Sequence, residues 1–269
     1  MSAKKLVVSG ASNTNGPWPT WADFIAERYE CQMHNVSKKG MGNEAIITSA
    51  IHAATKNLKP SDDATIAIML TSIDKWDWYV ADKNVVKRLD KEKHNITRLN
   101  ANDPNGFWCT GGHFPLDKEY FRQNYYSHDY FAFKNLQLIL MFYHVCNKNN
   151  WKYLVLYDSP IWSMLESELD ANLPIDDSSF KLVNNNLCKW LFDSTNVCED
   201  VYHPGLIGFL AKNNKPYFSE KYKCHPGPMS HLLFSKEHIF PKLDYLFQQK
   251  HDNEFLEEYA TKMDGLWTR

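Results

Sequence analysis

The sequence has no surplus of positive charge. Its 30 Lys and Arg residues are outnumbered by 32 Asp and Glu residues, so the formal net charge at pH 7 is −2. A protein that holds a phosphate backbone without regard to base sequence needs an excess of Lys and Arg. We therefore do not expect nucleic acid as a partner.

Long apolar runs are absent as well. A helix that spans a bilayer needs about 18 consecutive apolar residues. This sequence contains no such run. The N-terminus, "MSAKKLVVSG", turns polar too soon to contain the apolar core of a signal peptide. We therefore expect a cytoplasmic protein with no membrane partner.

The six cysteines contain no CxxC pair and are widely scattered. In a chain made without a secretion signal this indicates reduced thiols. A group of potential metal ligands lies toward the C-terminus, but its members lack the paired spacing of a structural zinc site: Cys198, His203, Cys224, His225 and His231. We expect neither a metal nor another cofactor.

What is present is typical of one large globular domain. The chain has 269 residues, of which 43% are hydrophobic, so it can bury a substantial core.

Apolar runs typical of strands alternate with segments of helical periodicity, and this alternation predicts a parallel sheet with helices on both faces, a three-layer α/β/α fold. The expected strands are 4–10, 31–37, 64–73 and 151–160; the expected helices are 18–29, 43–58, 130–149, 178–192 and one or two over about 235–265. Asn43 is the expected N-cap of the second helix.

Between residues 75 and 126 the periodic pattern disappears. This segment is rich in Asn, Asp, Gly and aromatic residues, so we expect an aromatic-rich insertion with little regular structure. We expect it to act as a lid over the sheet. Residues 196–224 are also expected to be irregular.

Small and polar residues follow the predicted strands. They are Ser12, the Gly40/Gly42 turn, Thr71 with Ser72, and Asp158 with Ser159. Because parallel α/β sheets bind ligands beyond the carboxyl ends of their strands, these residues are expected to converge on a binding site.

Four blocks in this order resemble the SGNH/GDSL hydrolases, and more narrowly the divergent SGNH-like proteins of bacteriophages. The blocks are "SGASNTNGPWP", "NVSKKGMGNEAI", the strand ending "LTS", and "CHPGPMSH". The resemblance covers residues 4–73 and about 150–250. It implies a flavodoxin-like sheet and a virus-encoded protein made in a host cell.

The resemblance also implies roles for individual residues. Ser12 matches the family's nucleophile, Gly40 the glycine of the second block, and His225 the base. A serine hydroxyl needs a nearby imidazole to accept its proton, and the developing oxyanion needs N–H donors. The N–H groups of Ser12 and Gly40 are the expected donors.

Two departures from the family pattern stand out. Ile73 occupies the place of the asparagine that acts as a further oxyanion donor, and Thr71, Ser72 and Asn43 are the candidate replacements. The family's Asp-x-x-His block is also altered, because Tyr222 lies three residues before His225.

The histidine itself has a rival. Glu220 is a candidate orienting carboxylate for His225, whereas "DVYHPG" places Asp200 and His203 in the family spacing. We favour His225 because "HPGPMSH" leads directly into a closing helix, as the base of the family does.

The resemblance predicts a serine esterase that forms an acyl-enzyme and acts on a small-molecule or carbohydrate ester, such as an O-acylated sugar. Two alternatives stay open. One is a degenerate protein that keeps the fold for carbohydrate binding or a structural role, and the other is an O-acyltransferase.

Overall fold

The computed structural model describes most of the predicted α/β scaffold. The described residues are 4–59, 62–71, 75–80, 97–99, 107–111, 128–158, 205–213, 225–244, 247 and 251–266. Within them no helix is both long and apolar enough to cross a bilayer.

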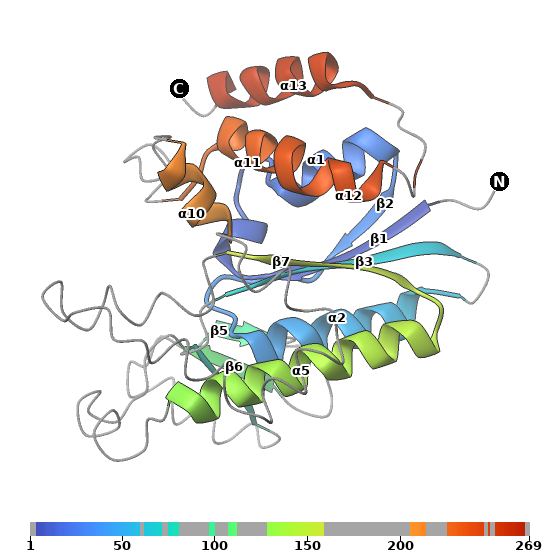
Figure 1. Cartoon of the computed structure of the whole chain (residues 1–269), viewed down its shortest axis with the longest axis vertical. Helices are drawn as coiled ribbons and strands as arrows, with labels where there is room; N and C mark the ends of the chain where they lie inside the picture. Colours follow the sequence, from blue (N-terminus) through green and yellow to red (C-terminus); the bar gives the residue numbers. More distant parts are fainter. Residues whose placement is uncertain are drawn as a thin grey trace, which may run out of the picture.

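A four-stranded parallel sheet forms the centre of the fold (Figure 1). The strand order is β2-β1-β3-β7, which places β1 and β3 inside the sheet. Their near-continuous apolar sequences follow from burial on both faces. The strands are β1 (Lys4–Gly10), β2 (Gln32–Asn35), β3 (Asp63–Leu70) and β7 (Lys152–Tyr157).

Helices cover both faces of this sheet, which confirms the three-layer α/β/α prediction (Figure 1). The core on one face includes Ile46, Ile66 and Phe142. The core on the other includes Trp21 and Phe234. The first face is covered by α2 (Asn43–Asn57) and α5 (His128–Lys148), and the second by α1 (Trp21–Tyr29), α10 (Gly205–Lys212), α11 (Pro228–Phe234) and α12 (Phe240–Leu243).

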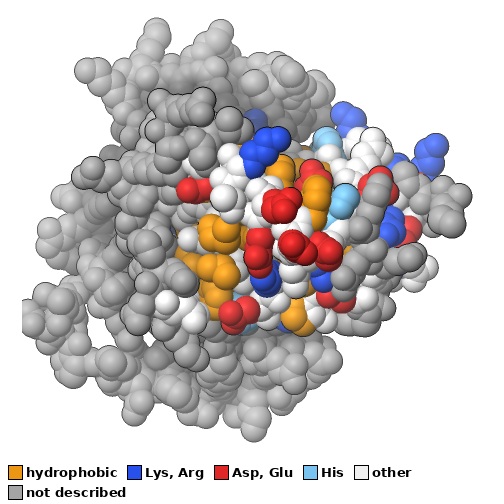
Figure 2. Space-filling view, turned by 90° about the horizontal axis from the view of Figure 1, so that it is seen from above, with side chains coloured by type: hydrophobic (Ala, Val, Ile, Leu, Met, Phe, Trp, Pro, Cys, Tyr) orange, Lys and Arg blue, Asp and Glu red, His pale blue; other side chains and the backbone are white. Residues whose placement is uncertain are grey.

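The last helix, α13 (Asn253–Leu266), packs on α11 and α1 as an outer layer (Figure 1). Its Leu256 and Ala260 are buried, whereas Glu254 and Glu258 are exposed. The face seen from this side accordingly carries acidic side chains beside a few apolar ones (Figure 2). A π-helix, Ser235–Ile239, joins α11 to α12.

Two segments that we expected to be irregular contain regular structure. The insertion forms a small antiparallel sheet in the order β4-β6-β5, because short aromatic and β-branched runs favour cross-strand pairing. The sequence "GLIGFLAK" forms α10, because its apolar residues pack against the second face of the parallel sheet. The small strands are β4 (Trp76–Val80), β5 (Thr97–Leu99) and β6 (Phe107–Gly111). The predicted helix 178–192 lies outside the described residues.

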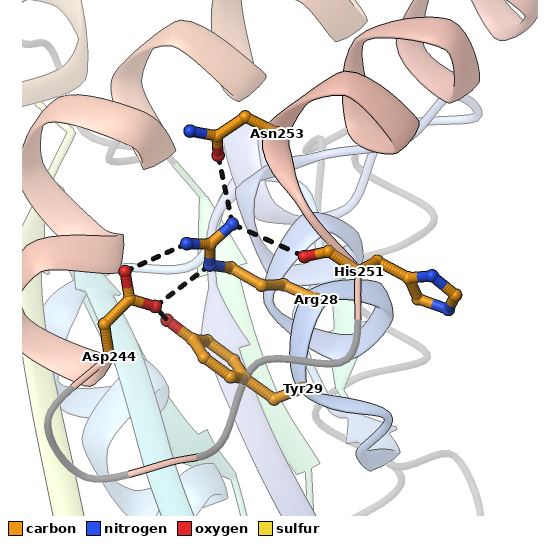
Figure 3. Close-up of polar contacts among 5 residues, drawn as sticks. All are labelled: Arg28, Tyr29, Asp244, His251 and Asn253. Atoms are coloured by element: carbon orange, nitrogen blue, oxygen red, sulfur yellow. Dashed lines mark hydrogen bonds and ion pairs between the residues drawn. The ribbon is translucent and has the colours of Figure 1, made fainter.

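A buried cation ties α1 to the C-terminal helices (Figure 3). The Arg28 guanidinium donates to both Asp244 carboxylate oxygens at 3.0 and 2.9 Å, and to Asn253 Oδ1 at 3.0 Å. Tyr29 donates its hydroxyl to Asp244 at 2.6 Å. The Arg28 side chain is only 5% exposed, so these bonds compensate a charge removed from water.

We expect Arg28→Met to lower the free energy of unfolding by about 2–3 kcal/mol, because it removes charged hydrogen bonds and leaves Asp244 without its cation. Chemical denaturation measures the loss. Lys236→Met is the control: it removes only the exposed ion pair with Glu257 and should cost less than about 1 kcal/mol. Equal losses in both variants would contradict the buried role of Arg28.

Candidate functional site

The turn that carries Ser12 is packed tightly against the end of β1. Ser12–Thr14 form one 3₁₀ turn, in which Asn13 and Thr14 are buried and Ser12 is half-buried. A Cβ at Gly10 would lie 2.2 Å from Thr14 Oγ1, so the strand needs glycine there. Thr14 Oγ1 also accepts a bond of 3.2 Å from Trp21 Nε1. These contacts hold Ser12 at the carboxyl edge of the sheet.

The loop that carries His225 is fastened to the loop after β1. Trp18 Nε1 donates to Pro226 O at 2.9 Å, across 208 positions of the sequence. Gly227 is the N-cap of α11 and Pro228 its first residue, so the half-buried His225 lies three residues before the start of that helix. The structure therefore brings the two predicted segments to the same region.

The Gly40 turn lies at the same edge. Lys38 N donates to Gly10 O at 3.2 Å, which extends the pairing of the chain after β2 with β1. Gly40 has a φ of 82°, a conformation that favours glycine. In the described part of the chain, the backbone N–H groups of Ser12 and Gly40 have no protein acceptor.

Asp158 is a buried carboxylate at the end of β7. The residue is 7% exposed, and Asn13 Nδ2 donates a hydrogen bond to its Oδ1. Burial raises the pKa of Asp158, while the charge of Lys75, the Asn13 hydrogen bond and the charge of His225 act in the opposite direction. The carboxylate thus lies within electrostatic reach of the predicted base and contacts the residue next to Ser12.

Lys75 supplies a cation at the end of β3. Its ammonium donates to Thr71 Oγ1 at 2.6 Å, and its charge acts on Asp158. The sequence predicted no role for Asn13 or Lys75. It placed Asp158 among the residues at the binding edge, as a carboxylate directly after a buried strand, without a catalytic role.

Asn43 has neither of the two roles predicted from the sequence, which were the N-cap of α2 and an oxyanion donor. Gly42 is the N-cap of α2, and Asn43 is the first helical residue. The Asn43 amide donates to Thr71 O at 2.9 Å and to Asn135 Oδ1 at 2.6 Å, and its Oδ1 accepts from Thr71 N at 2.8 Å. Since an amide has two hydrogens, none is left for an oxyanion. Asn43 is a buried structural bridge between α2, β3 and α5.

Asp77 of the insertion provides the cap that Asn43 does not. Its carboxylate accepts from the N–H groups of Gly42 and Ala45, both at 2.8 Å. A Cβ at Gly42 would lie 2.6 Å from Lys75 O and 2.7 Å from Asp77 Oδ2, so this approach requires glycine. The start of the insertion is therefore attached to the N-terminus of α2, beside the carboxyl edge. The rest of the predicted lid lies largely outside the described residues.

The Asp77 carboxyl predicts a pH-dependent stability. Burial raises its pKa from 3.8 to about 6 in spite of the two N–H donors, so the folded protein binds this proton more tightly than the unfolded chain. The resulting stabilisation is complete below about pH 4 and is lost as the pH rises through about 6. We expect the unfolding free energy of wild type relative to Asp77→Asn to fall by about 2–3 kcal/mol between pH 4 and 7, as measured by denaturant titration.

Asp62→Asn is a control of opposite sign. The Lys5 hydrogen bond lowers the pKa of Asp62, so the contribution of this carboxylate is present at neutral pH and is lost as the pH falls. If both variants change with pH in the same direction, the assignment for Asp77 is wrong.

The remaining predicted site residues are Ser72, Asp200 and His203, with Glu220 as a candidate partner. All four lie outside the described residues. Their roles stay predictions.

Comparison with protein-family models gave no match, and comparison with curated proteins gave no significant match. Among solved structures, a crystal structure of a member of the lipolytic protein G-D-S-L family from Veillonella parvula DSM 2008 aligns with this chain at 10% identity. The alignment covers 72% of this chain and 98% of that one, with a TM-score of 0.25. A similarity of this strength carries no argument about activity. The α/β assignment depends on the sheet and its helices.

Proposed function

We propose that this protein is a serine-dependent ester hydrolase of the SGNH type. The observation that carries the proposal is the hydrogen bond from Trp18 to Pro226, which joins the loops bearing Ser12 and His225 at the carboxyl edge of the sheet. The resemblance in four sequence blocks supports the same pairing of nucleophile and base. An O-acylated carbohydrate is the substrate class that this resemblance suggests.

In the proposed reaction, Ser12 Oγ attacks the ester carbonyl carbon and its proton passes to His225. The carbonyl oxygen becomes an oxyanion, which accepts hydrogen bonds from the N–H groups of Ser12 and Gly40. His225 then returns the proton to the departing alcohol, which leaves an acyl-enzyme. Water, deprotonated by the same imidazole, cleaves that ester and restores Ser12.

The turnover is expected to be slow. Asn43 has no free amide hydrogen, so the replacement for the family's third oxyanion donor is missing from this position. Loss of one such donor typically lowers the rate by about 10²–10³-fold.

The absence of a free Asn43 amide hydrogen also favours the second candidate function, a protein that keeps the fold for carbohydrate binding without catalysis. An O-acyltransferase would use the same acyl-enzyme with a sugar hydroxyl in place of water.

We expect a fluorophosphonate probe to label wild-type protein and not Ser12→Ala, because such probes react with hydroxyls activated by a base. Intact-mass spectrometry gives the stoichiometry. Ser9→Ala is a matched control from β1, the strand before the Ser12 turn. The Ser9 hydroxyl is fully buried, so this variant should label like wild type. Absence of labelling in wild type would favour the binding protein.

The two histidine candidates can be separated by ester hydrolysis. We expect His225→Ala to abolish activity, because Ser12 then has no proton acceptor, and His203→Ala to lower it only mildly. Far-ultraviolet circular dichroism checks that both variants fold. An inactive His203→Ala protein together with an active His225→Ala protein would assign the base to His203 and its carboxylate to Asp200.

A further inference from the structure

The Gly40 turn can direct its central N–H group in either of two ways. Met41 N donates to Lys38 O at 3.3 Å, so residues 38–41 form a four-residue turn with Lys39 and Gly40 at its centre. The φ of Gly40, 82°, is that of a type II turn. Type I differs mainly by a rotation of the central peptide, which reverses the Gly40 N–H, and glycine allows both types. Contacts outside the turn must therefore select the direction of this N–H.

One side of the turn is fastened to the parallel sheet. Lys38 N donates to Gly10 O at 3.2 Å and to the sulfur of the fully buried Met41 at 3.1 Å. These contacts hold the first and the last residue of the turn. They leave the direction of the central peptide undecided, because that peptide takes part in neither of them. A further restraint has to come from the chain that follows the turn.

Asp77 of β4 holds that following chain. One of its carboxylate oxygens accepts from Gly42 N and the other from Ala45 N, each at 2.8 Å. The approach is close, since a Cβ at Gly42 would lie 2.7 Å from Asp77 Oδ2. The first N–H groups of a helix have no partner within the helix, so they depend on such an acceptor. Asp77 therefore fixes the peptide between Met41 and Gly42, directly after the turn.

We propose that Asp77, a residue of the insertion, is a positioning residue for the candidate site: it selects the conformer of the Gly40 turn in which the Gly40 N–H faces the ester oxygen. This inference rests on the proposed function, which assigns that N–H to the oxyanion. It adds to the site a residue outside the four sequence blocks. The insertion thereby controls the oxyanion donor through one carboxylate.

The neighbouring polar residues of α2 do not perform this task. The Asn43 side chain is bonded to residues of β3 and α5, so it fastens the helix to the sheet without holding the peptide before Gly42. Glu44, the acidic residue in the first turn of α2, forms an ion pair with Lys134. Asp77 is therefore the residue whose replacement should release the turn.

The task requires a carboxylate. Two N–H groups need two acceptors, and an ionised carboxyl group offers two oxygens and no hydrogen. An amide has a single acceptor oxygen, so Asp77→Asn would direct an NH₂ group at one of the two N–H donors. Hydrogen bonds to an ionised acceptor are also stronger than those to a neutral one. The substitution keeps the size of the side chain but weakens its hold on Gly42.

The turn has a definite place in the proposed reaction. When Ser12 Oγ attacks the ester carbon, the carbonyl oxygen gains negative charge and accepts from the Gly40 N–H. In the flipped turn the C=O group of Lys39 would take the place of that N–H and repel the oxyanion. Asp77 neither touches the substrate nor exchanges a proton. It raises the fraction of molecules whose oxyanion donor is oriented before the ester binds.

The test compares Asp77→Asn with Glu44→Gln at about pH 8, where the Asp77 carboxyl, with a pKa of about 6, is ionised. Both variants lose one acidic charge near the N-terminus of α2, but only Asp77→Asn loses bonds to the main chain. We expect Asp77→Asn to be labelled at Ser12 by the fluorophosphonate about five- to tenfold more slowly and to the same endpoint, because its turns can still flip back. Glu44→Gln should be labelled at the wild-type rate.

The endpoint separates positioning from a purely structural role. Misfolded molecules would not react at all, so a structural role would lower the endpoint and leave the rate of the remaining molecules unchanged. That result, or a wild-type rate and endpoint in Asp77→Asn, overturns the proposal.

Nuclear Overhauser effects report the turn without any activity. The Lys39 Hα lies close to the Gly40 amide hydrogen in a type II turn and farther from it in type I, because the flip carries that hydrogen away. We expect this cross-peak to weaken about five- to tenfold in Asp77→Asn and to stay unchanged in Glu44→Gln. A weakened peak without any labelling of wild-type Ser12 would refute the hydrolase and keep the hold of Asp77 on the turn. An unchanged peak refutes that hold.

If Asp77→Asn does not fold, the wild-type protein decides the matter. As the pH falls through the Asp77 pKa of about 6, the carboxyl gains a proton and loses one acceptor oxygen. We expect the Gly40 amide signal to shift in the same pH range. The other charges that act on Asp77 are those of Glu44 of α2 and Lys134 of α5.

Two variants assign that step to Asp77. Glu44→Gln removes the neighbouring carboxylate, and His225→Gln removes the imidazole proposed as the base. The Gly40 step should persist in both. A Gly40 signal that is insensitive to pH in this range, or a step that disappears with either substitution, overturns the proposal.

Discussion

The hydrogen bond from Asn13 to Asp158 spans the end of β3, because β1 and β7 lie on either side of that strand. It joins residues 145 positions apart and closes the carboxyl edge of the sheet into one polar region. Without it, the 3₁₀ turn after β1 and the carboxylate after β7 would each be a buried polar group lacking a partner. The position of the turn that contains Ser12 depends on this bond.

A second buried network lies beside the first and has a different task. Asn43 exchanges two hydrogen bonds with the backbone of Thr71 and a third with Asn135, so it fastens α2 and α5 to the end of β3. Asp77 then closes the N-terminus of α2 from the insertion. These polar groups satisfy one another, which is what a scaffold needs and what leaves them unsuited to bind a ligand.

The two networks meet at Thr71. Its backbone belongs to the Asn43 bridge, and its hydroxyl accepts from Lys75, whose charge reaches Asp158. The insertion is therefore coupled to the candidate site at its first residues, through Lys75 and Asp77. Lys75 and Asp77 thus link the start of the insertion to the edge of the sheet at which Ser12 lies.

The spacing of apolar residues along the sequence determined the alternation of strands and helices and the parallel sheet. It also determined the edge at which Ser12, Gly40 and Asp158 lie. These features follow from local apolar spacing, which a sequence displays directly. The small antiparallel sheet was missed because short aromatic strands without a clear period look like a loop.

The hydrogen-bond partners were decided only by the tertiary structure. Asn43 was expected to be a helix N-cap or an oxyanion donor, yet its amide donates hydrogen bonds to residues 28 and 92 positions away. Asp158 was visible as a strand end, but its contact with Asn13 and its proximity to Lys75 and His225 were not. A sequence specifies which groups can donate and accept, whereas which of them meet depends on how the layers pack, and that is a property of the whole fold.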